Sequence, residues 1–277
     1  MTVLSLPLGR GSWARKLSLL AFLVTARRTA AQTTEPFTDP LTGIVFQRFF
    51  GARTSFGFGI ALPENPTTDF IGQLDVPMPN GEGWAGISLQ EDMVDPLLLV
   101  AWPNGNEVVT SFRIARNEDD SPPEVTGDFS IVQIPEGTVV TADKMVFTFL
   151  CQNCLDDGQL SFSPQNTQGK FGMGWALADR AVSDPADSAA ELPFHNVGFD
   201  EFDAVLSQAR NPLFGEWAQL AGAGIVSNGS TVAIPKDPPG LETGGGNDSG
   251  DDSGDSGDEG GDVADGGFDS DSDDDDF

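Results

Sequence analysis

Alternation of apolar residues with small or polar ones runs through the middle of the chain and restricts it to a fold built from β-strands. In SFGFGIAL, Phe56, Phe58 and Ile60 share one face while glycines occupy the other. Turn signals, two PNG stretches and one PEG stretch, separate such runs. The further runs are DFIGQLDV, GWAGISL, PLLLVAW, NEVVTSFRI, DFSIVQI, TVVTADKMVFTFL and KFGMGWALA. Many short strands at this spacing predict an all-β, antiparallel β-sandwich.

Local signals add detail to this prediction. The PNG stretch at residues 103–105 predicts a hairpin, because it joins two apolar runs across very few residues. Residues 199–209, FDEFDAVLSQA, are the one segment whose pattern predicts a helix. Glycine weakens a strand unless the backbone approaches something closely. A flat ligand lying against the sheet, or simple bulges and bends, would each explain the glycines at 57, 59, 72, 86, 172 and 174.

The two ends of the chain differ from its middle. Residues 1–31 predict a signal peptide, because basic residues precede a short apolar run and small residues precede Gln32. That run is too short to cross a bilayer, so we expect a secreted, extracellular protein with no membrane span. Residues 237–277 are rich in Asp, Gly and Ser and predict a disordered acidic tail. A single folded domain is expected over residues 32–236.

Charge excludes some partners. The chain carries 43 acidic and 14 basic residues, and the domain remains strongly acidic without its ends. So little positive charge argues against nucleic acid or anionic membrane as a partner. The NGS and NDS stretches make Asn228 and Asn247 candidates for glycosylation in a secreted chain.

The chain lacks the residues that several classes of reaction require. His195 is the single histidine, so a two-histidine zinc site is impossible, and no GxSxG stretch supports a serine hydrolase. Hydrolysis by paired carboxylates stays open, because acidic residues are abundant. In CQNC, Cys151 and Cys154 hold both thiols of the chain. In a secreted protein this spacing favours a short-loop disulfide over a redox dithiol or half of a metal site.

Met93 and His195 are left as candidate metal ligands. Met93 lies among polar residues in SLQEDMVDP, ahead of an apolar run. A lone histidine is commonly a structural residue, and an isolated methionine commonly fills a gap in packing. From the pattern alone, structural roles and a His/Met metal pair both remain open.

Several stretches occur in a characteristic order: FTDPLTGIVF, FIG, GWAGISL, Met93 followed by LLLVAWPNG, CQNC, GWALA and FHNVGF. In this order they resemble a known family, the cytochrome domain of cellobiose dehydrogenase. The resemblance extends from about Gln32 to Ala221.

The resemblance implies a β-sandwich that binds one haem b without a covalent bond, at one end or face of the sandwich. It places the axial iron ligands on Met93 and His195, and it matches Cys151 and Cys154 to the family's disulfide. Because thioether and imidazole fill both axial positions, such an iron passes electrons rather than activating oxygen. The resemblance therefore implies an electron-transfer cytochrome rather than a stand-alone catalyst.

The sequence also departs from the family. It has no Gly-rich dinucleotide fingerprint, so we expect no sugar-oxidising flavin domain. Tyrosines that relatives carry near the haem are absent, and IARNEDD follows Arg113 where the family has aromatic residues.

Two functions are expected on this basis. The first is a secreted cytochrome that takes an electron from a flavin-dependent dehydrogenase or a small reductant. It would pass that electron to ferric iron or to a copper polysaccharide oxygenase. The alternative is a carbohydrate-binding β-sandwich without redox activity.

Overall fold

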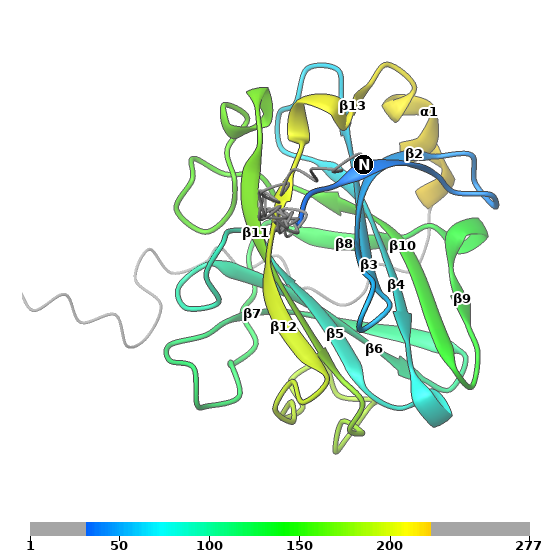
Figure 1. Cartoon of the computed structure of the whole chain (residues 1–277), viewed down its shortest axis with the longest axis vertical. Coiled ribbons are helices and arrows are strands. Elements are labelled where there is room, and N and C mark those ends of the chain that lie inside the picture. Colours follow the sequence, from blue (N-terminus) through cyan, green and yellow to red (C-terminus); the bar gives the residue numbers. More distant parts are fainter. Residues whose placement is uncertain (1–31, 223–277) are drawn as a thin grey trace, which may run out of the picture. The chain divides into compact units, whose positions relative to one another are not determined.

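The chain folds into two antiparallel sheets that pack face to face (Figure 1). The computed structural model describes residues 32–222. The predicted all-β antiparallel sandwich is confirmed. The predicted signal peptide, the acidic tail, Asn228 and Asn247 lie outside the described residues.

The larger sheet has eight strands in the order β1-β2-β3-β4-β10-β8, with β13 paired to β3 and β9 to β10. Its strands are β1 (Glu35–Thr38), β2 (Val45–Gly51), β3 (Phe56–Pro63), β4 (Phe70–Pro77), β8 (Ser130–Gln133), β9 (Val139–Val140), β10 (Lys144–Gln152) and β13 (Arg210–Asn211). The smaller sheet has five strands in the order β12-β11-β5-β6-β7. They are β5 (Trp84–Ser88), β6 (Leu97–Asn104), β7 (Glu107–Ile114), β11 (Phe171–Ala178) and β12 (Gly198–Ala204).

Helical structure within residues 32–222 is short. The α-helix is α1 (Phe214–Ala218), and the 3-10 turns are η1 (Pro79–Gly81), η2 (Pro135–Gly137), η3 (Asn166–Gln168), η4 (Leu206–Gln208) and η5 (Gln219–Ala221). No helix in this part of the chain is long and apolar enough to cross a membrane.

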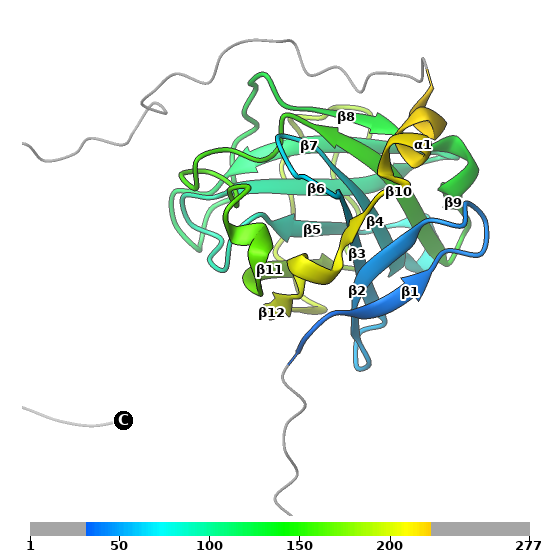
Figure 2. The ribbon, with the colours of Figure 1, turned by 90° about the horizontal axis from the view of Figure 1, so that it is seen from above.

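The central core fills the space between the two sheets. The alternation in β3 works as the sequence predicts, because Phe56, Phe58 and Ile60 all belong to this core. A second apolar cluster lies on the outer face of the larger sheet and includes Phe214 and Trp217 of α1. Figure 2 shows α1 beside β10. Burial of both layers holds the sandwich together.

The predicted hairpin and disulfide are both present. Strands β6 and β7 pair up to Asn104 and Glu107, and Gly105 takes a φ of 64° that favours glycine in such a turn. The Cys151–Cys154 disulfide closes a short loop at the end of β10, with 5.7 Å between the Cα atoms.

The predicted helix at residues 199–209 is wrong. Most of it is β12, which pairs with β11 from Gly198 to Ala204, and η4 follows. Phe199, Phe202 and Leu206 have a spacing that a helix would place on one face. Pairing along a whole edge of the sheet outweighs this local pattern, since it buries Phe202 in the core and leaves Phe199 61% exposed.

Close packing in the larger sheet gives a test of the fold. A Cβ atom at Gly72 would lie 2.3 Å from Cζ of Phe149, the residue paired with it on β10. Phe149 is fully buried and stacks on Phe147, so its ring cannot move aside. We expect Gly72→Ala to lower the free energy of unfolding by about 1–3 kcal/mol in urea titration.

Gly215→Ala is the matched control. Gly215 lies in α1, and a Cβ atom added there would have no other atom within 4 Å, so alanine is neutral or stabilising. Equal effects of the two substitutions would contradict the packing around Gly72.

Candidate functional site

A cavity of about 510 Å³ lies on the outer face of the five-stranded sheet. This volume is in the range of cofactor and ligand pockets. Its floor is formed by alternate residues of three neighbouring strands, which point away from the central core. They are Gly86 and Ser88 of β5, Leu98 and Val100 of β6, and Gly174 and Ala176 of β11.

The small residues of the floor leave the space above the sheet open. Gly86 and Gly174 both line the cavity, as the hypothesis of a flat ligand against the sheet requires. The hypothesis is wrong for Gly57, Gly59 and Gly72, which lie against Arg48, Phe46 and Phe149 within the larger sheet. Sequence alone could not separate the two groups, because the same alternation produces both.

Met93 reaches the cavity from the turn between β5 and β6. The turn is held by local contacts: Ser88 Oγ donates to the carbonyl of Asp92 at 2.5 Å, and the Val94 N–H donates to Asp92 Oδ1 at 3.2 Å. Gln90 Nε2 also donates to the carbonyl of Gln159 at 3.0 Å. These bonds determine where the Met93 thioether lies.

His195 reaches the same cavity from residues 179–197, a stretch without regular structure between β11 and β12 that we name the His195 segment. The ring contacts Phe194 and Phe199, with centroids 4.2 and 4.5 Å away. His195 is 9% exposed, and its Nδ1 is buried without a hydrogen-bond partner. Burial lowers the pKa of His195, which favours the neutral imidazole that binds metals.

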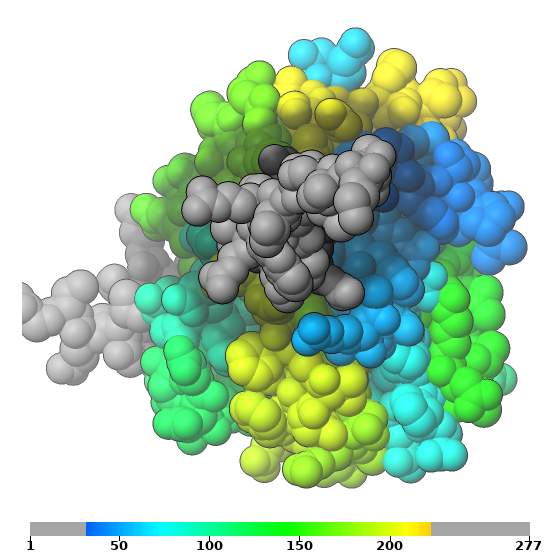
Figure 3. All heavy atoms as spheres, viewed as in Figure 1, coloured from blue at the N-terminus to red at the C-terminus, as the bar shows by residue number. Residues whose placement is uncertain are grey.

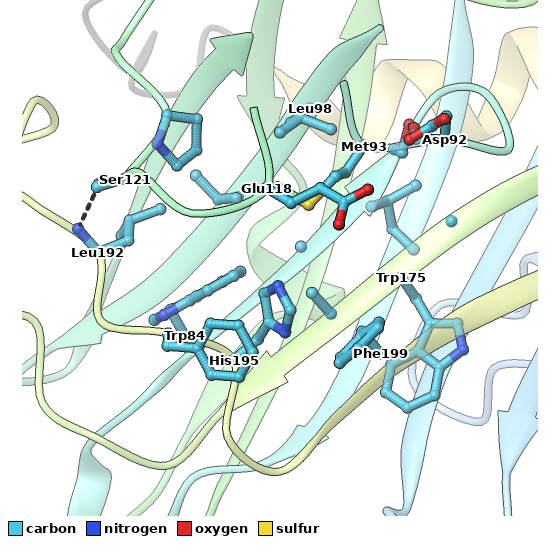
Figure 4. A pocket seen from close by; sticks show the side chains of 18 of the residues that line it. Trp84, Asp92, Met93, Leu98, Glu118, Ser121, Trp175, Leu192, His195 and Phe199 are labelled. Atoms are coloured by element: carbon cyan, nitrogen blue, oxygen red, sulfur yellow. Dashed lines mark hydrogen bonds between the residues drawn. The ribbon is translucent and has the colours of Figure 1, made fainter. Parts of the chain in front are cut away.

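The structure thus brings the two predicted ligands together, although 102 residues separate them in the chain. Figure 4 shows Met93 and His195 approaching the cavity from opposite sides. A soft thioether and a neutral imidazole form a donor set suited to haem iron. The two floor glycines and the donor set both fit a flat, iron-containing group.

The rim of the cavity is acidic. Seven carboxylates line it, and no Lys or Arg does among the described residues: Glu91, Asp92, Glu118, Asp119, Asp120, Asp200 and Glu201. Partial desolvation and the charges of Glu91, Asp200 and Asp92 raise the pKa of Glu201. The rim therefore carries negative charge that no basic residue of the lining neutralises.

Sequence reasoning missed this rim and Phe199. The rim carboxylates form three groups, at residues 91–92, 118–120 and 200–201, which lie on separate loops or strands and meet only in the fold. Phe199 lies in the segment for which the sequence predicts a helix. Figure 3 shows β12 and the His195 segment (yellow-green to yellow) together at the lower edge of this face.

Comparison with known proteins agrees with the fold. The family described as the cytochrome domain of cellobiose dehydrogenase matches residues 37–216. A pyrroloquinoline quinone-dependent pyranose dehydrogenase of Coprinopsis cinerea is 28% identical over 203 residues, which are 69% of this chain and 26% of that protein. The chain thus spans about a quarter of the length of this curated relative.

Two solved structures are similar. The cytochrome domain of Myriococcum thermophilum cellobiose dehydrogenase has a TM-score of 0.62 and 31% identity, covering 70% of this chain and 99% of that one. The cytochrome b domain of pyranose dehydrogenase from Coprinopsis cinerea has a TM-score of 0.59 and 24% identity, covering 72% and 99%. At that identity the second similarity shows the fold alone.

The charges on the rim predict a pH-dependent stability. Because the pKa of Glu201 is raised in the folded protein, its ionisation disfavours folding once the pH rises above its ordinary pKa of 4.5. We expect Glu201→Gln to raise the melting temperature at pH 7 by about 1–2 °C. The gain should vanish below about pH 4, where the carboxylate is protonated in both states.

Melting curves between pH 3 and pH 8 check this. Glu64→Gln, in the exposed turn after β3, is the control and should show no such trend. A gain for Glu201→Gln that persists at low pH would contradict repulsion as its cause.

Proposed function

The chain belongs to the family of the cytochrome domain of cellobiose dehydrogenase, and we propose that it is an electron-transfer protein that binds one haem b. The observation that carries the proposal is the meeting of Met93 and His195, a thioether and an imidazole, in one cavity.

Bound haem b supplies one-electron chemistry between ferric and ferrous iron. Met93 Sδ and the His195 imidazole would be its axial ligands. Because Met93 and His195 would both hold the iron, the group would serve electron transfer rather than binding of oxygen or a substrate. The apolar floor and Leu192 exclude water from the buried side, and the flanking rings of Phe194 and Phe199 hold the imidazole plane.

Membership of the family supports an electron-transfer partner for the chain. We propose that the donor is a flavin-dependent dehydrogenase or a small reductant, and that the acceptor is ferric iron or a copper polysaccharide oxygenase. Secretion is part of the proposal. The Cys151–Cys154 disulfide supports it, because disulfides persist in oxidising compartments.

Replacing the ligands tests the haem site. The purified full chain should show a low-spin haem b spectrum when reduced. Met93→Ala and His195→Ala should each open a coordination position, change that spectrum to high-spin, and weaken haem binding at least about tenfold. Difference spectra and haem titration measure both effects.

Met145→Leu is the control, because Met145 is buried in β10 and does not line the cavity. It should keep the parent spectrum. A parent chain that takes up no haem, or ligand variants with unchanged low-spin spectra, would contradict the proposal. Retention of a haem-free chain on cellulose would support the carbohydrate-binding alternative instead.

The acidic rim predicts which reagents exchange electrons fastest. A cleft lined by one sign of charge raises association rates with ions of the opposite sign by about 10- to 1000-fold at low salt. We expect the ferrous protein to reduce hexaammineruthenium(III), a cation, at a rate that falls as salt is added. Its reduction of ferricyanide, an anion, should become faster under the same change.

Stopped-flow measurements at several salt concentrations check this. The double variant Asp200→Asn and Glu201→Gln should flatten both salt dependences, whereas Asp143→Asn, in the exposed turn between β9 and β10, should not. Salt dependences of the same sign for both reagents would show that the rim does not steer them.

A further inference from the structure

The His195 segment holds its shape with little help from backbone pairing. In the described part of the chain, one backbone hydrogen bond joins the segment to a strand, from the Val197 N–H to the Leu177 carbonyl at 3.2 Å. Turn bonds within the segment, such as Asp187 N–H to the Asp184 carbonyl, do not connect it to the sheet. Other contacts must therefore determine where His195 lies.

One further contact is the bond from the Leu192 N–H to Ser121 Oγ at 2.9 Å. Three side chains from neighbouring strands donate to carbonyls of the segment, and we name them the donor clamp: Trp84 of β5, Trp102 of β6 and Arg113 of β7. Trp84 Nε1 donates to the Pro193 carbonyl at 2.8 Å, and Trp102 Nε1 donates to the Pro185 carbonyl at 3.0 Å. The pairing of Ala85 with Ala101 sets the two tryptophans opposite each other on the outer face.

Arg113 is the centre of the clamp. Its Nη2 donates to the carbonyls of Ser188 and Ala190, at 2.5 and 2.9 Å. Its Nη1 donates to the Pro122 carbonyl at 2.8 Å, in the loop that also carries Glu118 to the cavity. One guanidinium thus ties the His195 segment to the loop that forms another part of the cavity wall.

The burial of Arg113 makes these bonds costly to lose. Arg113 is 1% exposed, and none of the ion pairs within residues 32–222 involves it. The guanidinium is stabilised by its three carbonyl acceptors, by Ser111 Oγ, which accepts from Nε at 2.7 Å, and by the nearby charges of Glu124 and Asp187. Lysine cannot replace it, because an ammonium lacks the planar fork that reaches several carbonyls at once.

We infer that the donor clamp positions His195 for iron ligation, with Arg113 and Trp102 acting as positioning residues that never touch the haem. This inference rests on the proposed function, since it assigns His195 to the iron. Neither Arg113 nor Trp102 lines the cavity, so any effect of Trp102 on haem must pass through the His195 segment, and any effect of Arg113 through that segment or through the loop of Pro122.

The test uses Arg113→Lys and Trp102→Phe in the full chain, each loaded with haem. Trp102→Phe removes a single N–H donor and provides a mild variant if Arg113→Lys folds poorly. Arg48→Lys and Trp217→Phe are matched controls: Arg48 pairs with Asp75 on the larger sheet, and Trp217 belongs to α1 and is buried in the apolar cluster outside the larger sheet. Haem loss is followed by transfer to apomyoglobin, and hydrogen–deuterium exchange is followed across residues 179–197.

The clamp variants should lose haem about tenfold faster than the parent. Exchange in the His195 segment should rise in the same variants, with or without haem. The controls should lower the melting temperature while leaving haem loss within about twofold of the parent.

Each contrary result is informative. Unchanged hydrogen–deuterium exchange across the His195 segment in both clamp variants would show that the donor clamp does not hold the segment. Faster exchange with unchanged haem loss overturns its role in positioning His195. A parent chain that takes up no haem overturns the proposed function instead, and exchange without haem then decides whether the clamp holds the segment.

Discussion

Burial of both faces of the five-stranded sheet is the constraint on which the site depends. One face packs against the larger sheet. The other carries large apolar residues such as Trp84 and Trp102, so chain outside the two sheets must cover it. The His195 segment covers part of that face, where Val182, Ala190 and Leu192 pack on Trp84 and Trp102. The remaining part is the floor of the cavity.

The sizes of the outward residues decide which part is covered. Along β5 they decrease from Trp84 to Gly86, and along β11 the outward residues are Ala178, Ala176 and Gly174. The large indoles fill the space beneath the segment and supply donors for its carbonyls. Beyond them the glycines leave a hollow, and the segment delivers His195 to its edge. The decrease in side-chain size therefore explains both where the His195 segment covers the sheet and where the cavity lies next to it.

Much of the fold follows from short-range pattern, and little of the site does. Alternation and turn residues predict the strands because each strand buries one face locally, as β3 illustrates. Residues 199–209 mislead because pairing with β11 outweighs a helical spacing. Met93 and His195 could be singled out by resemblance, but their meeting depends on loops that fold against a sheet. The clamp escapes prediction because indoles and a guanidinium in strands look like ordinary core and surface residues until their acceptors are known.

The two proposed ligands are held by different kinds of contact. Met93 lies in a tight turn that Ser88 and Asp92 hold locally, and backbone bonds at both ends of the turn, from the Gly174 N–H to the Gln90 carbonyl and from the Asp95 N–H to the Ala115 carbonyl, join it to the rest of the fold. His195 depends on hydrogen bonds that span 77 and 109 residues of the chain, donated by Arg113 and Trp84. Local opening of proteins begins where few backbone hydrogen bonds connect a segment to the core. The His195 segment is such a place, so the imidazole is the ligand that local opening would release first, while the thioether stays on its turn.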